Sequence, residues 1–135
     1  MGQIVGIDLG TTNSVVGVIE AGRPIVIANS EGSRTTPSIV GFTKDKEIVI
    51  GDQARRQLVL NPKNTFYNLK RFIGSDWDEL DDTSISVPYN VKANNKGSVR
   101  VLSPNTEREY APEELVSSLI RKLINDAETY LGDTV

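Results

Sequence analysis

The stretch Ile7-Asp8-Leu9-Gly10-Thr11-Thr12-Asn13-Ser14 lies between two short apolar runs near the start of this 135-residue chain. Runs that are rich in β-branched residues and separated by turn formers predict strands at residues 4–9, 15–19 and 25–28, arranged as a meander. Both faces of these strands are largely apolar, so we expect a sheet that helices cover on each side.

Asp8 stands near the end of the first strand, where an apolar residue would otherwise pack. Burying an unpaired carboxylate costs several kcal/mol, so the position calls for a partner, a raised pKa or a metal. The following turn, residues 10–14, has no bulky side chain, and its consecutive amides can form an anion-binding nest. A carboxylate would repel a phosphate unless Mg²⁺ lay between them, so the pair predicts a phosphate site with magnesium. A purely structural hairpin is the alternative, because short Gly/Thr/Asn turns are common.

The middle of the chain predicts a hairpin of strands at 38–43 and 47–50. A helix is expected over 53–60 with Asp52 as its N-cap, followed by a short helical segment over 64–72 that ends at Gly74.

Two more strands, at 87–91 and 99–102, are expected around a turn at 94–97. The acidic segment 75–82, with Trp77 at its centre, is typical of a solvated loop rather than a metal site.

A long amphipathic helix is expected from Pro112, which suits the first helical position, to a cap at Gly132. Residues 133–135 then read as the lead into another strand, from which we expect the chain to be a fragment.

Composition excludes several classes of protein. The chain has 15 Lys and Arg against 18 Asp and Glu, a net charge of −3, which excludes a strongly basic nucleic-acid binder. It has no Cys and no His, which removes disulfides, thiolate nucleophiles, Cys/His zinc sites and imidazole-based triads. No signal peptide or bilayer-spanning stretch is recognisable, so we expect no membrane partner and a cytosolic location.

Three segments carry a family resemblance. They are the opening stretch over residues 7–14, then Glu31-Gly32-Ser33-Arg34-Thr35-Thr36-Pro37-Ser38, and Asn64-Thr65-Phe66-Tyr67-Asn68-Leu69-Lys70-Arg71-Phe72-Ile73-Gly74. In this order and spacing they resemble the Hsp70 molecular chaperones, of the bacterial DnaK type. The resemblance covers the whole chain and is weakest over residues 75–110.

The resemblance implies an α/β fold, a truncated actin-like ATPase lobe of ribonuclease-H-like architecture with a mixed sheet and flanking helices. Residues 1–37 and 112–135 would form part of the first ATPase subdomain, and residues 38–111 an inserted α/β subdomain. The second phosphate loop, the adenosine pocket and the peptide-binding domain would lie in later sequence.

The resemblance also assigns roles to residues. The turn would hold the β- and γ-phosphates of ATP or ADP through its amides and hydroxyls, at Gly10, Thr11, Thr12 and Asn13. Asp8 would hold Mg²⁺ through bound waters, and Lys70 would orient the γ-phosphate and the attacking water. Without the resemblance, a lysine on a short helix is typical of a solvated surface. The absence of histidine is compatible with these roles, because ATP hydrolysis depends on positioning and charge neutralisation.

The implied function is ATP hydrolysis that drives binding and release of unfolded polypeptides by a C-terminal domain. The implied partners are a J-domain co-chaperone and a nucleotide exchange factor, the latter docking in part on the loop 29–34. We expect bacterial cytoplasm, or alternatively a plastid stroma, and little or no activity from the fragment alone. The alternatives are another actin-like ATPase or sugar kinase lobe, which share the first motif, and a non-enzymatic structural domain.

Overall fold

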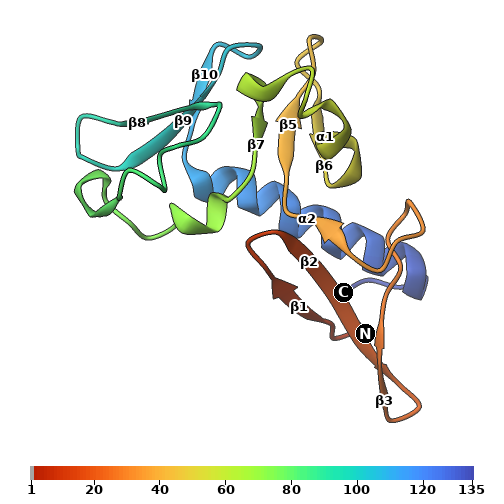
Figure 1. Ribbon diagram of the computed structural model, residues 1–135. Coiled ribbons are helices and arrows are strands. Elements are labelled where there is room, and N and C mark those ends of the chain that lie inside the picture. The colour runs from red at the N-terminus through yellow and green to blue at the C-terminus, as the bar shows by residue number, and fades with distance from the viewer. Residues whose placement is uncertain (1) are drawn as a thin grey trace.

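The computed structural model describes residues 2–135, and Figure 1 shows how its elements are arranged. Single 3₁₀ turns cover Pro62–Asn64, Leu69–Arg71 and Trp77–Glu79. The strands and helices are β1 (Gly6–Leu9), β2 (Asn13–Glu20), β3 (Arg23–Val26), β4 (Thr36–Pro37), β5 (Val40–Phe42), β6 (Ile48–Ile50), α1 (Asp52–Gln57), β7 (Thr65–Phe66), β8 (Asn90–Ala93), β9 (Val99–Ser103), β10 (Arg108–Tyr110) and α2 (Pro112–Leu131).

The first sheet has the order β1-β2-β3, as predicted for the meander, and β4 pairs with β2. Along β2, alternate residues Ser14, Val16 and Val18 are buried. The valines pack with Ala127 of α2 in one cluster. Only this face is covered within residues 2–135, so the prediction of a sheet covered on both sides is wrong for the part of the chain described.

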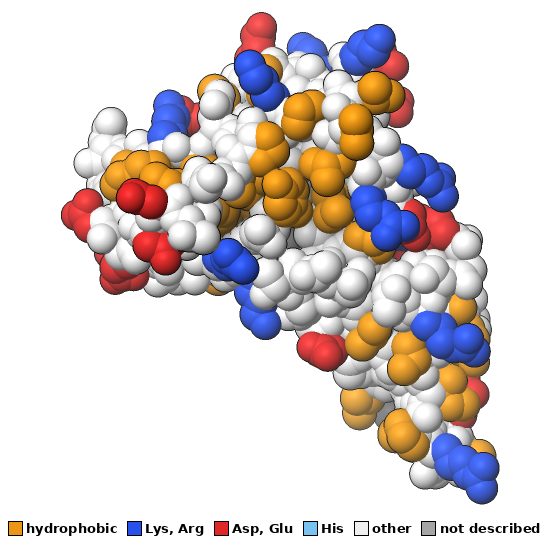
Figure 2. Space-filling model, viewed as in Figure 1, with side chains coloured by type: hydrophobic (Ala, Val, Ile, Leu, Met, Phe, Trp, Pro, Cys, Tyr) orange, Lys and Arg blue, Asp and Glu red, His pale blue; other side chains and the backbone are white. Residues whose placement is uncertain are grey.

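The opposite face of the first sheet is open and apolar. Ile4 is 89% exposed and Ile19 is 65% exposed. Together with Pro24 and Val26 they line a groove. Hydrophobic side chains are visible in the lower part of Figure 2, where Figure 1 places β1, β2 and β3.

The second sheet, in the order β6-β5-β7, confirms the hairpin predicted from residue 38 onward. Helix α1 begins at Asp52 with Gly51 as its N-cap and ends at Gln57. The prediction of Asp52 as N-cap was therefore wrong by one residue, and that of a helix to residue 60 was three residues too long. Asp52 instead pairs with Arg55 one turn later, at 2.8 Å.

The helical segment predicted over residues 64–72 is wrong in its first half. Thr65 and Phe66 form β7, which pairs with Val40 and Gly41 of β5. Phe66 is fully buried there and contacts the rings of Phe42 and Tyr89 edge-on. Burial against the edge of a sheet outweighs the local helical pattern.

The third sheet, in the order β10-β9-β8, contains the predicted hairpin with its strand ends shifted. Strand β10 was not predicted, and it has only three residues. Every strand pair in the described chain is antiparallel, so the predicted mixed sheet is not found there. Parallel neighbours need long crossover connections, whereas most neighbours here are joined by short turns.

Helix α2 confirms the most regular pattern in the sequence. Pro112 is its first residue, Glu114 accepts a hydrogen bond from the Ala111 amide at 3.1 Å, and Gly132 caps the other end at φ 66°. Leu115, Leu119 and Leu123 are buried in the main core, which also contains residues of the second and third sheets. No helix within residues 2–135 is long and apolar enough to cross a membrane.

Candidate functional site

The turn between β1 and β2 is so tight that only glycine fits at its first position. A Cβ on Gly10 would lie 2.2 Å from the carbonyl oxygen of Asn13, far inside ordinary contact. Thr11 is half-buried, and Thr12 and Asn13 are exposed. The four predicted phosphate-binding residues therefore form one accessible turn, and a turn of this composition offers amides and hydroxyls to an anion.

Asp8 precedes this turn and is exposed. Strand alternation places it with Gly6 on the open face of the sheet, while Ile7 and Leu9 pack inward. The prediction that Asp8 is buried is therefore wrong, because no helix of residues 2–135 covers that face. None of the ion pairs in the described chain involves Asp8, which leaves its carboxylate available to a cation.

Lys70 reaches this region from a part of the chain 61 residues away. Its ammonium Nζ donates a hydrogen bond to the Leu9 carbonyl oxygen at 2.8 Å. The 3₁₀ turn that carries Lys70 is anchored by Leu69, which is 4% exposed and belongs to the main core. A buried neighbour thus holds an exposed cation next to the turn.

Lys70, Gly10 and Thr11 line one small depression together with Leu9 and Ser38. The structure therefore brings the predicted cation and the first half of the predicted phosphate turn into contact with the same space. Asp8, Thr12 and Asn13 do not line this depression. An ammonium, a carboxylate and a nest of amides around one turn are suited to a phosphate and a divalent cation.

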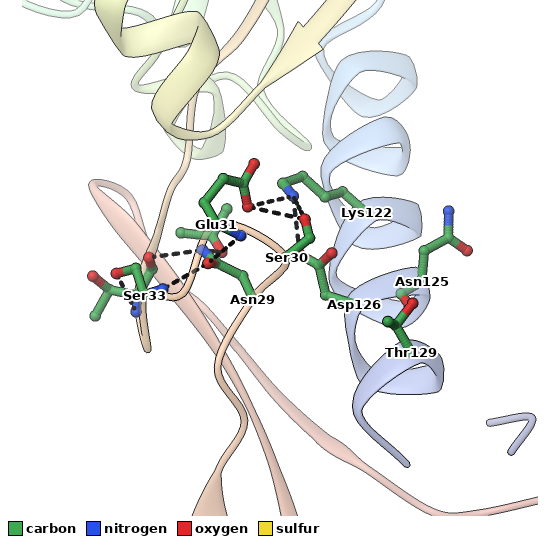
Figure 3. Close-up of polar contacts among 10 residues, drawn as sticks. Asn29, Ser30, Glu31, Ser33, Lys122, Asn125, Asp126 and Thr129 are labelled. Atoms are coloured by element: carbon green, nitrogen blue, oxygen red, sulfur yellow. Dashed lines mark hydrogen bonds and ion pairs between the residues drawn. The ribbon is translucent and has the colours of Figure 1, made fainter. Parts of the chain in front are cut away.

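The loop 29–34, predicted as a partner-docking segment, is more ordered than its composition suggests. Asn29 organises it by accepting hydrogen bonds from the amides of Glu31 and Ser33, at 3.1 and 2.8 Å. Figure 3 shows Lys122 of α2 reaching toward this loop. Its ammonium lies 3.1 Å from a Glu31 carboxylate oxygen and 3.0 Å from one of Asp126.

Lys122 and Glu31, the ion pair that joins α2 to the loop, both keep their charges. Burial works to lower the pKa of the Lys122 ammonium, but its hydrogen bonds to Asp126 and Glu31 outweigh this effect, and the pKa lies above its usual value of 10.5. Burial likewise works to raise the pKa of Glu31, but hydrogen bonds from Lys122 and Ser30 outweigh it, and the pKa lies below its usual 4.5. The loop is therefore held to α2 by charges that persist at neutral pH.

Comparison with known families decides the wider assignment. The family model described as "Hsp70 protein" matches residues 4–135. The chain belongs to the Hsp70 family. This membership favours the chaperone interpretation over the sugar kinases and actin-like filament proteins that carry a related first motif.

The Hsp70 chain is also similar to curated cyanobacterial proteins over its full length. It is 90% identical to "Chaperone protein dnaK1" of Prochlorococcus marinus subsp. pastoris and 58% identical to "Chaperone protein dnaK3" of Thermosynechococcus vestitus. It is 54% identical to "Chaperone protein DnaK" of Trichormus variabilis. In each case all 135 residues are matched, and they make up 20% of the relative's length. The Hsp70 chain thus spans about one fifth of these relatives.

Sequence reasoning missed two groups that the structure places at these sites. Lys122 and Asp126 are four residues apart, a spacing that predicts an ion pair on one helix face. The contact from Lys122 to Glu31 joins residues 91 apart, which no local pattern in this Hsp70 chain could indicate. The second group is the pair of buried hydroxyls of Ser14 and Ser38, next to the turn that is predicted to bind phosphate.

Proposed function

We propose that this Hsp70 chain forms one wall of an ATP site. The turn Gly10-Thr11-Thr12-Asn13 would bind the β- and γ-phosphates of ATP, mainly through its amides. Two observations support this. The turn is exposed and its first position, Gly10, admits no Cβ. The Lys70 ammonium donates a hydrogen bond to the carbonyl oxygen of Leu9, the residue before the turn. Consecutive amides and a nearby cation are a common arrangement for holding phosphate oxygens.

Asp8 would hold Mg²⁺ through bound water molecules. The donors fit this ion, because Mg²⁺ prefers oxygen ligands and keeps several of its waters, and the Asp8 carboxylate is exposed and outside every ion pair of the described residues. When bound, the ion would neutralise charge on the phosphates.

Lys70 would orient the γ-phosphate and the attacking water. Hydrolysis of ATP to ADP and phosphate depends on positioning and on stabilising charge, which an ammonium and fixed amides supply without a histidine. In the described structure the Lys70 ammonium donates a hydrogen bond to the Leu9 carbonyl, which holds it next to the turn over residues 10–13.

The whole protein would be an ATP-dependent chaperone built on an actin-like ATPase fold. Residues 1–37 with 112–135 would form part of the first ATPase subdomain of ribonuclease-H-like architecture, and residues 38–111 the inserted subdomain. A C-terminal domain would bind unfolded polypeptides, a J-domain protein would stimulate hydrolysis, and an exchange factor would dock in part on the loop 29–34. The location would be bacterial cytoplasm, or a plastid stroma if the gene is organellar.

The test is titration of Mg·ATP into a full-length protein that contains this chain, with and without Asp8→Asn. Losing a group that holds a metal through its waters should weaken affinity on the order of tenfold or more. Asp82→Asn is the matched control, because Asp82 is an exposed acid in the distant acidic segment. Unchanged affinity in Asp8→Asn would favour the structural-hairpin alternative.

The isolated chain should hydrolyse ATP slowly or not at all, because the proposed site needs a second wall from later sequence. Single-turnover hydrolysis with radiolabelled ATP would measure this. Sustained turnover at one site per chain of residues 1–135 would contradict the proposed two-walled architecture.

A further inference from the structure

Two buried hydroxyls lie directly behind the phosphate turn. Ser14 is 1% exposed and Ser38 is 6% exposed. Their Oγ atoms are 2.9 Å apart, and Ser38 Oγ also donates to the Gly10 carbonyl oxygen at 2.8 Å. The function proposed above uses neither serine.

The direction of this hydrogen-bond chain follows from counting protons. A serine hydroxyl has one proton, and that of Ser38 is donated to the Gly10 carbonyl, which can only accept. The bond between the two hydroxyls must therefore be donated by Ser14. The resulting chain runs from Ser14 through Ser38 to Gly10, and each bond in such a chain polarises and strengthens the next.

Ser38 also holds the turn through its backbone. Its amide donates to the Thr12 carbonyl oxygen at 2.8 Å, just beyond the β2–β4 pairs Ser14–Thr36 and Asn13–Pro37. One residue therefore hydrogen-bonds two carbonyls of the turn, those of Gly10 and Thr12, once through its side chain and once through its main chain.

Fixing these two carbonyls also fixes two amides. In a trans peptide the N–H points opposite to the C=O of the same plane. The Gly10 carbonyl shares its plane with the Thr11 amide, and the Thr12 carbonyl shares its plane with the Asn13 amide. Because both carbonyls point at Ser38, the Thr11 and Asn13 amides point away from it, toward the outer side of the turn.

We propose that Ser38 is the positioning residue of the phosphate turn, orienting the Thr11 and Asn13 amides toward the phosphates of the nucleotide. This inference rests on the phosphate-binding function proposed above. Ser38 does not touch the nucleotide. Its hydroxyl sets the direction of groups that do, so its loss should reduce the part of the affinity that comes from phosphates and leave the part that comes from adenosine.

The test compares ADP with adenosine, by calorimetry, in a full-length protein that contains this chain. Ser38→Ala removes the donor to Gly10 and should weaken ADP binding about tenfold, the effect of one buried hydrogen bond and its unpaired acceptor, with adenosine affinity unchanged. Ser38→Thr keeps the hydroxyl and should restore ADP affinity to within about threefold.

Ser103→Ala is the matched control. Ser103 is also buried, at 0% exposed, and its hydroxyl donates to the Asn64 side-chain oxygen at 2.8 Å in a part of the core away from the turn. It should lose stability much as Ser38→Ala does, yet bind ADP and adenosine normally. Hydrogen exchange in the nucleotide-free protein gives a second measurement, in which the amide of residue 38 should exchange about tenfold faster in Ser38→Ala than in Ser103→Ala.

The outcomes separate the two proposals. If the unaltered protein binds ADP no better than adenosine, the phosphate site itself fails. If it prefers ADP but Ser38→Ala retains that preference, or loses ADP and adenosine affinity equally, the positioning role of Ser38 is wrong while the phosphate site stands. If Ser38→Ala fails to fold, Ser14→Ala takes its place. This variant leaves the hydrogen bond from Ser38 to Gly10 but removes the hydroxyl that polarises it. It must weaken ADP binding about two- to threefold for the inference to hold.

Discussion

Replacing Gly10 by alanine tests the geometry of the proposed phosphate turn most directly. The added Cβ would lie 2.2 Å from the Asn13 carbonyl oxygen, whereas ordinary contact begins near 3.4 Å. The neighbouring atom belongs to the backbone, so no side chain can rotate away, and the turn itself must open by about 1 Å. Overpacking of this kind costs about 1–3 kcal/mol of folding free energy.

The same displacement should impair binding more than it impairs folding. Misplacing a binding group by about 1 Å can cost on the order of 100-fold. We therefore expect Gly10→Ala, in a full-length protein that contains this chain, to lose most of its affinity for Mg·ADP while still unfolding cooperatively. Calorimetric titration and thermal unfolding measure the two effects on one sample.

Gly6→Ala is the matched control, because Gly6 begins the strand β1 that leads into the turn and its Cβ would meet nothing within 4 Å. It should change neither stability nor Mg·ADP affinity appreciably. The reasoning is refuted if Gly10→Ala binds Mg·ADP normally, or if Gly6→Ala is impaired to the same extent.

Three further changes have defined outcomes. Lys70→Met should lower single-turnover hydrolysis by roughly 100-fold or more while weakening Mg·ATP binding much less, and equal losses in both would contradict an orienting role. Phe66→Ala should cost about 3–5 kcal/mol in denaturant unfolding, whereas Val59→Ala, at a side chain 87% exposed, should stay within about 0.5 kcal/mol. Glu31→Gln should lower hydrogen-exchange protection of the loop 29–34 about two- to fivefold at neutral pH. Because the pKa of Glu31 is lowered, that protection should be complete above about pH 4.5 and decline below it, and the glutamine variant should lack this decline.

Much of the fold could be predicted because it follows local rules. Helix α2 combines a first-position proline, a regular apolar spacing and a terminal glycine, and the structure contains all three features at the expected residues. The β5–β6 hairpin was likewise evident from two apolar runs around a polar turn. These elements are specified within a dozen or two neighbouring residues.

The errors came from contacts between distant residues. Thr65 and Phe66 became a strand because β5 offered an edge to pair with, which no local pattern reveals. Asp8 is exposed because coverage of the sheet depends on which elements surround it, not on the strand's own sequence. The Ser38 bonds to Gly10 and Thr12 join residues 28 and 26 apart, so the candidate site could be located from sequence but its support could not.

The position of α2 has a consequence for how this Hsp70 chain melts. Leu115, Leu119 and Leu123 pack in the core that contains the second and third sheets, while Ala127, farther along the same helix, packs against the first. Helix α2 thus packs against every sheet of the described chain. None of the three sheets can unfold without losing its contacts with α2, so we expect thermal unfolding of the described chain in one cooperative step.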